Sequence, residues 1–150
     1  MQSYALNRKG YRDFEIIEKY ESGIKLYGHE VKSIKEGKAD LKGAYVKFIK
    51  GYPVLIGLKV PLYTKATNIL VHDPARTKEL LLNRAEIKSL LGKVEQKGFA
   101  LIPLKIYSKG RLLKLLVGLA RGKAKANKKQ ELIKKQQDLE VRKILKNQRN

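Results

Sequence analysis

The sequence predicts a mainly β protein: a closed antiparallel barrel with a few short helices. Two observations lead to this fold class. Short runs of alternating apolar and polar residues recur along the chain, and glycine-containing turn signals separate them in pairs that are typical of hairpins. The chain has 150 residues, of which 43% are hydrophobic, enough for one core of ordinary size.

The first elements follow from local patterns. Residues 1–10 are polar and end in a basic string, which indicates a flexible start. Two apolar-patterned runs, 14–18 and 24–27, flank the turn-forming residues 21–23, so we predict a β-hairpin there. Residues 28–37 predict the end of a strand and one helical turn that a glycine terminates.

The middle of the chain predicts a second hairpin and two helices. The hairpin spans residues 44–60, with Lys50-Gly51 at its tip. After a loop, Asp73-Pro74 has the composition of a helix start, and we place the leucines 80–82 in that helix. Apolar residues at helical spacing predict another helix over 84–96.

A third hairpin completes the barrel. Its strands cover 99–107 and 111–119 around a turn at 108–110, and Pro103 indicates an edge strand or a bulge. About six strands, arranged in hairpins and interrupted by two or three small helices, favour a barrel of the oligonucleotide-binding type.

The charge divides the chain into two predicted parts. A body, residues 1–118, carries 23 Lys/Arg and 11 Asp/Glu, and a tail, residues 119–150, carries 11 and three. A hinge at 118–123 joins them. The tail has too little apolar surface to order itself, so we expect it to be flexible until an acidic partner orders it.

A net charge of +20 indicates nucleic acid as the partner. An anionic membrane fits less well because the apolar residues of the tail form no single stripe. The chain has no cysteine and two histidines, His29 and His72, which we interpret as partly buried, hydrogen-bonded side chains. We therefore expect no catalysis, no metal and no cofactor, and, without a signal or membrane-spanning segment, a cytoplasmic location.

Cations and aromatic rings alternate along the chain in a way that suits RNA. The rings could stack on exposed bases while the cations neutralise phosphates. In the alternative interpretation the tyrosines form the barrel rim and the lysines are solvated. The cations at turns and helix starts are Arg8, Lys9, Lys38, Lys65, Arg76, Lys78 and Lys123, and the rings are Tyr4, Tyr11, Tyr20, Tyr27, Tyr45, Tyr52, Tyr63 and Tyr107.

Six ordered strings resemble one bacterial family. They are Asn7-Arg8-Lys9, Tyr20-Glu21-Ser22-Gly23-Ile24, Gly28-His29-Glu30-Val31-Lys32-Ser33, Gly37-Lys38-Ala39-Asp40, the stretch 72–82 and Gly118-Leu119-Ala120-Arg121-Gly122-Lys123. From residue 7 to its end the chain resembles small protein B, the SsrA-binding protein family. The resemblance implies a partner, the tRNA-like domain of transfer-messenger RNA (tmRNA, or SsrA RNA), and we expect the free protein to be a monomer. It also implies trans-translation: ribosome rescue with tagging of the nascent chain, while the tail enters the empty mRNA channel at the decoding centre.

The resemblance also implies the site residues. It places the main RNA contacts at Asn7, Glu21 and Leu81. Supporting phosphate or stacking groups are Lys38, Tyr45, Arg76, Lys78 and Lys123. The ribosome-contacting tail residues are Lys128, Lys129, Lys134, Lys135, Arg142 and Lys143.

The chain departs from the family where Ala126-Asn127-Lys128-Lys129 replaces an aromatic or histidine followed by Asp-Lys-Arg. The charge is kept there, whereas the ring and the carboxylate are lost. Two alternatives to this function remain open. One is a generic basic ribosomal or single-stranded nucleic-acid-binding protein, and the other is a nuclease or RNA-modifying enzyme.

Overall fold

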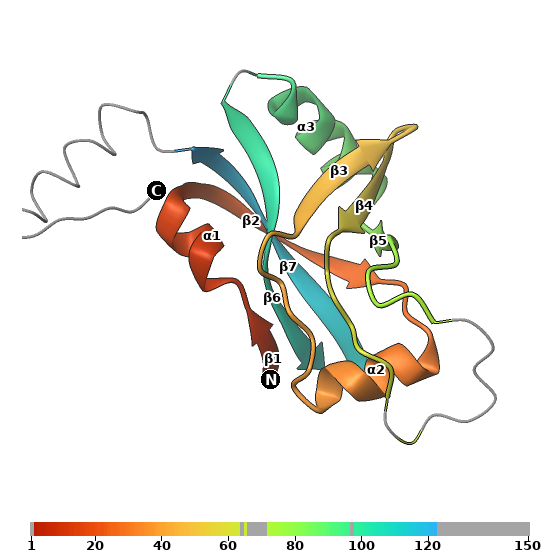
Figure 1. Ribbon diagram of the computed structural model, residues 1–150. Helices are drawn as coiled ribbons and strands as arrows, with labels where there is room; N and C mark the ends of the chain where they lie inside the picture. Colours follow the sequence, from red (N-terminus) through yellow and green to blue (C-terminus); the bar gives the residue numbers. More distant parts are fainter. Residues whose placement is uncertain (1, 64, 66–71, 97, 123–150) are drawn as a thin grey trace, which may run out of the picture.

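A computed structural model describes residues 2–63, 65, 72–96 and 98–122. These residues form seven strands and three helices (Figure 1). In chain order they are β1 (Ser3–Leu6), α1 (Arg8–Asp13), β2 (Phe14–Ile24), α2 (Gly28–Lys35), β3 (Tyr45–Ile49), β4 (Tyr52–Ile56), β5 (Lys78–Leu81), α3 (Arg84–Val94), β6 (Phe99–Lys109) and β7 (Leu112–Gly122).

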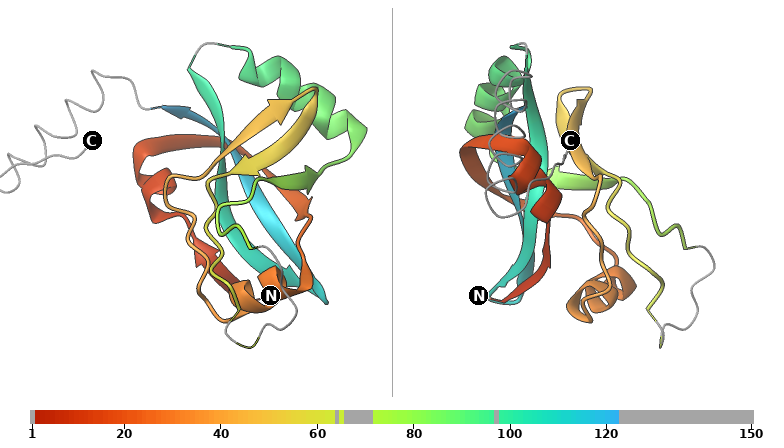
Figure 2. Two further views of the ribbon diagram at one scale, coloured as in Figure 1. Left: turned by 45° about the vertical axis from the view of Figure 1, so that its right-hand side comes forward. Right: turned by 60° about the vertical axis from the view of Figure 1, so that its left-hand side comes forward.

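The strands close into a ring. Their order is β1-β6-β3-β4-β5-β2-β7, and a further pairing of β7 with β6 completes the circle. Every pairing is antiparallel. Six strands form the ring, and β1 adds to β6 beside β3. Figure 2 shows β3 and β4 facing the long strands β6 and β7 across the barrel. The predicted mainly β, closed antiparallel barrel of about six strands is confirmed.

The apolar residues gather on both faces of β6 and β7. The larger cluster fills the barrel, where side chains such as Leu55, Leu58 and Leu115 are fully buried. A smaller cluster on the outer face contains Ile102, Leu104 and Ala120, with Phe14, Ile16 and Leu116 against it. The backbone approaches this cluster closely, since a Cβ at Gly118 would lie 2.9 Å from Leu104 Cδ1. The long strands are therefore buried on both sides.

The N-terminal segment is ordered, contrary to the prediction of a flexible start. Residues 3–6 pair with β6, and residues 8–13 form α1. The Asn7 side chain joins them because its Oδ1 accepts from Gly10 N, which caps the helix. The sequence pattern missed both elements because their partner, β6, lies at the other end of the chain.

The predicted hairpin at residues 21–23 is wrong, because β2 runs through that segment as one strand. It pairs with β7 from Phe14 to Gly23. The turn-forming residue types have other uses here: Ser22 Oγ points inward and donates to Leu115 O at 3.0 Å. Gly23 leaves room for Leu81 on the neighbouring strand, as a Cβ there would lie 3.1 Å from Leu81 Cβ.

The predicted helix over residues 80–82 is also wrong. Asp73 Oδ1 accepts from Ala75 N at 2.9 Å, so the Asp-Pro signal marks a turn. The chain then enters β5, where Lys78 and Leu80 are buried and Glu79 and Leu81 are exposed. This alternation suits a half-buried strand rather than a helix.

Other local predictions hold with shifted boundaries. The β3–β4 tip is at Lys50 and Gly51, both at positive φ, 53° and 83°. The helix α2 is longer than the predicted single turn and is followed by Gly37 at φ 78°. The helix α3 confirms the prediction for residues 84–96.

The prediction of the last hairpin is also confirmed, with a bulge between Pro103 and Lys105. Pro103 lies within β6, which pairs on both sides, so it does not mark an edge strand. The predicted hinge belongs to β7 as far as Gly122, and Leu119 and Ala120 inside it are buried. Residues 123–150, most of the predicted tail, lie outside the described residues. Among the described helices, none is long and apolar enough to cross a membrane.

Candidate nucleic-acid interface

Glu21 and Leu81 lie on the same outer face of the barrel. The pairing of β2 with β5 places Gly23 opposite Leu81, and the leucine side chain lies over the glycine. Glu21 is two residues before Gly23, so its side chain emerges on the same face. Leu81 is 54% exposed although it is apolar. We call the outer face formed by Glu21, Gly23 and Leu81 the β2–β5 ridge.

The Glu21 carboxylate is held at both oxygens. Tyr107 Oη donates to Oε2 at 2.5 Å, and Lys109 Nζ donates to Oε1 at 3.0 Å. These two hydrogen bonds, followed by the charges of Lys109 and Lys114, lower the pKa of Glu21. Burial and the hydrogen bond to Glu21 raise the pKa of Tyr107. The carboxylate is thus a fixed, ionised acceptor beside two cations.

The family resemblance did not imply a site role for Tyr107, Lys109 or Lys114. All three come from the β6–β7 hairpin, in which Tyr107 pairs with Lys114. Their proximity to Glu21 depends on the register of β2 on β7, which places Glu21 opposite Leu116. Only that long-range register could have identified them.

Asn7 lies inside the protein and not on its surface. It is 5% exposed, its Oδ1 accepts from Gly10 N at 3.0 Å, and its Nδ2 donates to Pro103 O at 2.8 Å. Its backbone N also donates to Leu104 O. The amide that was expected to contact a base edge is therefore engaged in fixing α1 against β6.

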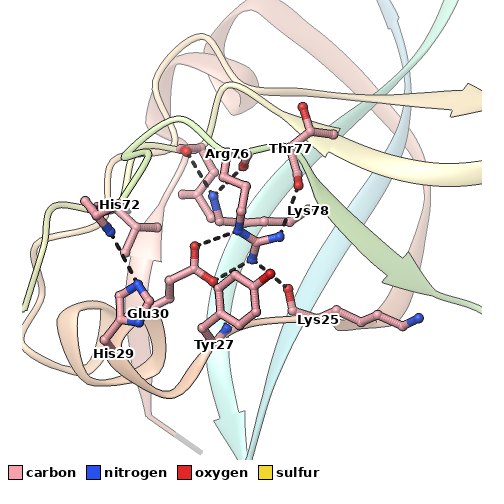
Figure 3. A network of polar contacts seen from close by, with 10 residues as sticks. Lys25, Tyr27, His29, Glu30, His72, Arg76, Thr77 and Lys78 are labelled. Carbon is pink, nitrogen blue, oxygen red and sulfur yellow. Dashed lines mark hydrogen bonds and ion pairs between the residues drawn. The ribbon is translucent and has the colours of Figure 1, made fainter. Parts of the chain in front are cut away.

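Lys78 and Arg76 differ in their access to a ligand. Lys78 is fully buried, and its Nζ donates to Arg76 O at 2.6 Å. Burial lowers the pKa of Lys78. Arg76 is partly exposed, and its guanidinium forms two hydrogen bonds to Glu30, at 3.0 Å from Nε and 2.5 Å from Nη2 (Figure 3). Of the two predicted phosphate-binding residues, only Arg76 reaches the surface.

Glu30 is the buried centre of this polar network. Burial by itself raises its pKa, but the hydrogen bonds from Arg76 and from the Tyr27 backbone, with the charges of Arg76 and Lys78, outweigh it. The pKa of Glu30 therefore lies below its usual range. Because Glu30 belongs to α2 and Arg76 precedes β5, the pair ties the helix to the start of that strand.

The two histidines are partly buried, as predicted, and lie side by side. His72 Nε2 is 3.0 Å from Val60 O, and because a carbonyl only accepts, this nitrogen donates. In the neutral His72 ring the Nδ1 atom then accepts from His29 Nε2 at 3.3 Å. Both rings have structural partners, and the described residues contain no group of three or more potential metal ligands.

The remaining predicted residues are dispersed. Tyr45 is 46% exposed and lines two adjoining cavities of about 300 and 380 Å³, which share Phe14 and Ile102 as walls. Lys38 is exposed after α2, with its Nζ 3.2 Å from Glu36. Lys123 and the predicted tail contacts, Lys128, Lys129, Lys134, Lys135, Arg142 and Lys143, lie outside the described residues.

The ridge therefore combines three kinds of contact suited to RNA. It has an ionised acceptor for amino or hydroxyl groups, an exposed apolar side chain that can pack on a base or ribose, and neighbouring cations for phosphates. The acceptor and the apolar group come from adjacent strands, so their spacing is fixed by the barrel.

Three comparisons place this geometry among known proteins. A family model described as "SmpB protein" matches residues 4–147. The SsrA-binding protein of a Nitratiruptor species is 41% identical over 150 residues, covering 99% of this chain and 100% of that protein. The SsrA-binding protein of Halothermothrix orenii is 43% identical, covering 95% and 91%.

A solved structure is similar as well. It is described as "tmRNA-SmpB: a journey to the center of the bacterial ribosome", and the matching chain is 46% identical. The match covers 83% of this chain and 91% of that one, with a TM-score of 0.67.

Proposed function

Because this chain belongs to the SmpB family of SsrA-binding proteins, we propose that it binds tmRNA and acts with it in trans-translation on the ribosome. In this function the protein delivers the tRNA-like domain of tmRNA to stalled ribosomes, so that they are rescued and the nascent chain is tagged. Full-length relatives named for SsrA binding and a structural neighbour named for tmRNA and the ribosome support this assignment.

The observation that carries the proposal for the body is the β2–β5 ridge. Glu21 supplies a fixed acceptor and Leu81 an exposed apolar surface within one rigid pair of strands. Such a pair recognises an RNA by the shape and edges of exposed nucleotides rather than by charge alone. In this proposal Lys109 and Lys114 neutralise nearby phosphates, and Asn7 positions α1 instead of touching RNA.

For the tail we propose a separate role. Residues 123–150 carry ten Lys/Arg and three Asp/Glu, a composition suited to a channel lined with RNA. The proposal assigns Lys128, Lys129, Lys134, Lys135, Arg142 and Lys143 to the mRNA channel and decoding centre. In this proposal the boundary between body and tail lies at Gly122, where β7 ends, and not at residue 118.

The protein is proposed to be a cytoplasmic, monomeric adaptor without catalytic activity. Its family is one of RNA-binding proteins. The enzyme alternative makes a simple prediction, because an enzyme would cut or modify the RNA. Recovery of unaltered tmRNA after prolonged incubation with the protein would exclude it.

A binding titration tests the proposal. The full chain is titrated at two salt concentrations against the tRNA-like fragment of tmRNA and against an unstructured RNA of equal length. We expect tight binding to the fragment that survives the higher salt, because shape-specific contacts add to charge neutralisation. Equal and strongly salt-dependent binding to both RNAs would instead indicate a generic basic nucleic-acid-binding protein.

Leu81→Ala tests the ridge itself. We expect about fivefold weaker binding to the fragment, since roughly 1 kcal/mol of apolar contact is lost, and no change in the unfolding midpoint because Leu81 is exposed. Leu6→Ala is the matched control: Leu6 is 49% exposed but lies in β1, which pairs with β6 and not with β2 or β5. Equal affinities for the two variants would argue against the ridge.

A further inference from the structure

The β2–β5 ridge continues beyond Gly23 and Leu81. Lys25 N donates to Glu79 O at 2.9 Å, and the Lys25 and Glu79 side chains form an ion pair at 3.4 Å. Arg76 Nη2 then donates to Lys25 O at 3.3 Å. Tyr27 follows Lys25 by two residues, so the same outer face leads from Glu21 to Tyr27. At about 3.3 Å per residue, the two side chains are about 20 Å apart along the ridge.

At this end of the ridge an exposed ring lies against a fixed cation. The Arg76 guanidinium is 4.5 Å from the centre of the Tyr27 ring. Glu30 holds the guanidinium through two hydrogen bonds, and the same carboxylate accepts from Tyr27 N at 2.8 Å. The His29 ring is stacked at 5.8 Å from that of Tyr27 (Figure 3). One buried carboxylate thus fixes both the cation and the backbone that carries the ring.

The exposure of Tyr27 is the unusual feature. Its side chain is 60% exposed in spite of these contacts, whereas the Glu30 side chain beneath is buried. A structural role for the Glu30–Arg76 pair explains the buried ion pair but requires no aromatic ring in the solvent. Aromatic rings beside guanidinium groups are surfaces on which unstacked bases are held.

We propose that Tyr27 and Arg76 form a stacking site for one unpaired nucleobase, at the opposite end of the ridge from Glu21. The site rests on the proposed function and adds a second anchor to it. Tyr27 supplies the π face, and Arg76 supplies a charge that favours a nearby phosphate. The unpaired base can come from tmRNA or from ribosomal RNA, since the chemistry of the ring is the same for both.

The absence of tryptophan from the chain permits a direct test. Tyr27→Trp creates a protein with a single tryptophan, whose fluorescence a stacked base quenches. Tyr52→Trp is the matched control, because Tyr52 is 68% exposed but lies at the tip of the β3–β4 hairpin. Each full-length variant is titrated with the fluorescently labelled tRNA-like fragment of tmRNA and, separately, with ribosomes. The anisotropy of the labelled fragment and co-sedimentation with ribosomes report binding independently of the quenching.

We expect strong quenching at position 27 and little at position 52 in at least one arm, and that arm identifies the source of the base. Tyr27→Ala should weaken binding to the same RNA about tenfold, as expected for the loss of one stacked base, and Tyr27→Phe should restore it. Unchanged unfolding midpoints would show that α2 remains folded.

Two results would overturn the proposal, and they are distinguishable. Binding without preferential quenching at position 27 in either arm would remove the stacking site and leave the tmRNA function intact. A wild-type protein that bound neither tmRNA nor ribosomes would remove both.

Discussion

Glu21 is a carboxylate on a strongly basic protein, and its neighbours determine its ionisation and its orientation. Tyr107 and Lys109 both donate to it, so it remains ionised and pointed in one direction. An acceptor of this kind distinguishes amino and hydroxyl groups from phosphates, which only accept and are repelled by it. Such selectivity is useful where many cations would otherwise bind any RNA.

The first prediction concerns this carboxylate. Because the hydrogen bond from Tyr107 lowers the pKa of Glu21, Tyr107→Phe should raise that pKa. Carbon-13 NMR titration of the Glu21 carboxyl group measures the change. Lys109→Met removes the other donor and should shift the pKa in the same direction. An unchanged pKa of Glu21 in both variants would mean that these two donors do not lower it.

Asn7 leads to a prediction about stability instead of binding. Asn7→Ala should lower the free energy of unfolding by about 2 kcal/mol, because it removes a helix cap and leaves the buried Pro103 carbonyl without that donor. Urea unfolding measures this loss. The exposed cap of α3 provides the control, since Asn83→Ala should cost only about 1 kcal/mol. Equal losses would show that burial of Asn7 adds nothing.

At the scale of elements, α2 and β5 are joined by one ion pair. Glu30 lies in α2 and Arg76 two residues before β5, so the pair sets where the strand that carries Leu81 begins. The buried Lys78 adds a hydrogen bond to Arg76 O at the same place. Two short elements that would not be stable alone are thereby fixed to the barrel.

This pair predicts a pH dependence. The folded-state pKa of Glu30 lies below its unfolded value, so its contribution to stability is present above the unfolded pKa, about 4.3. That contribution is lost as the pH falls through the folded value. Glu30→Gln should therefore be less stable than the wild type by about 3 kcal/mol at pH 7, and the difference should shrink in acid. Urea unfolding at pH 7 and pH 3 tests this, and a constant difference would contradict it.

The same elements show what the sequence could predict. Lys50 and Gly51 form a local turn, and α3 has helical spacing and its own cap, so both were predictable from neighbouring residues. The strand β5 was not, because Asp73-Pro74 suits a turn as well as a helix start and only pairing with β2 and β4 decides. The strand β2 looked like a hairpin because its partner β7 is so distant.

The candidate interface shows the same difference between what neighbouring residues predict and what long-range pairing decides. Glu21 and Leu81 could be named from family strings, but their position on one outer face arises from the register of Gly23 on Leu81. Lys78 and Arg76 are two residues apart and both basic, so sequence alone gave them the same role. The structure buries one and leaves the other partly exposed. Local composition identifies the kinds of residue, whereas access to a ligand depends on the barrel.

At the scale of the whole molecule, the barrel and the basic C-terminal segment have separable tasks in our proposal. Residues 1–122 contain every strand of the ring and the entire ridge. Truncation after Gly122 should therefore leave binding to the tRNA-like fragment within about threefold and reduce its salt dependence, because fewer cations meet phosphate. It should abolish peptide tagging on stalled ribosomes.

Affinity titrations and a tagging assay with the truncated protein measure these two effects. A control truncation after Asn147 removes only the last three residues and should preserve both activities. Continued tagging by the shorter protein would refute the role of residues 123–150.

The closure of the ring by β2 and β7 also bears on how this protein is made. The strand β2 emerges early during synthesis, but its partner from Phe14 to Gly23 is the last strand of the ring. Until β7 leaves the exit tunnel, β2 and β6 each have an unpaired edge, and such edges tend to associate with other chains. A truncated message for this protein would give a fragment that cannot close its barrel. Its own co-translational folding therefore depends on ribosomes that translate the message as far as the last strand.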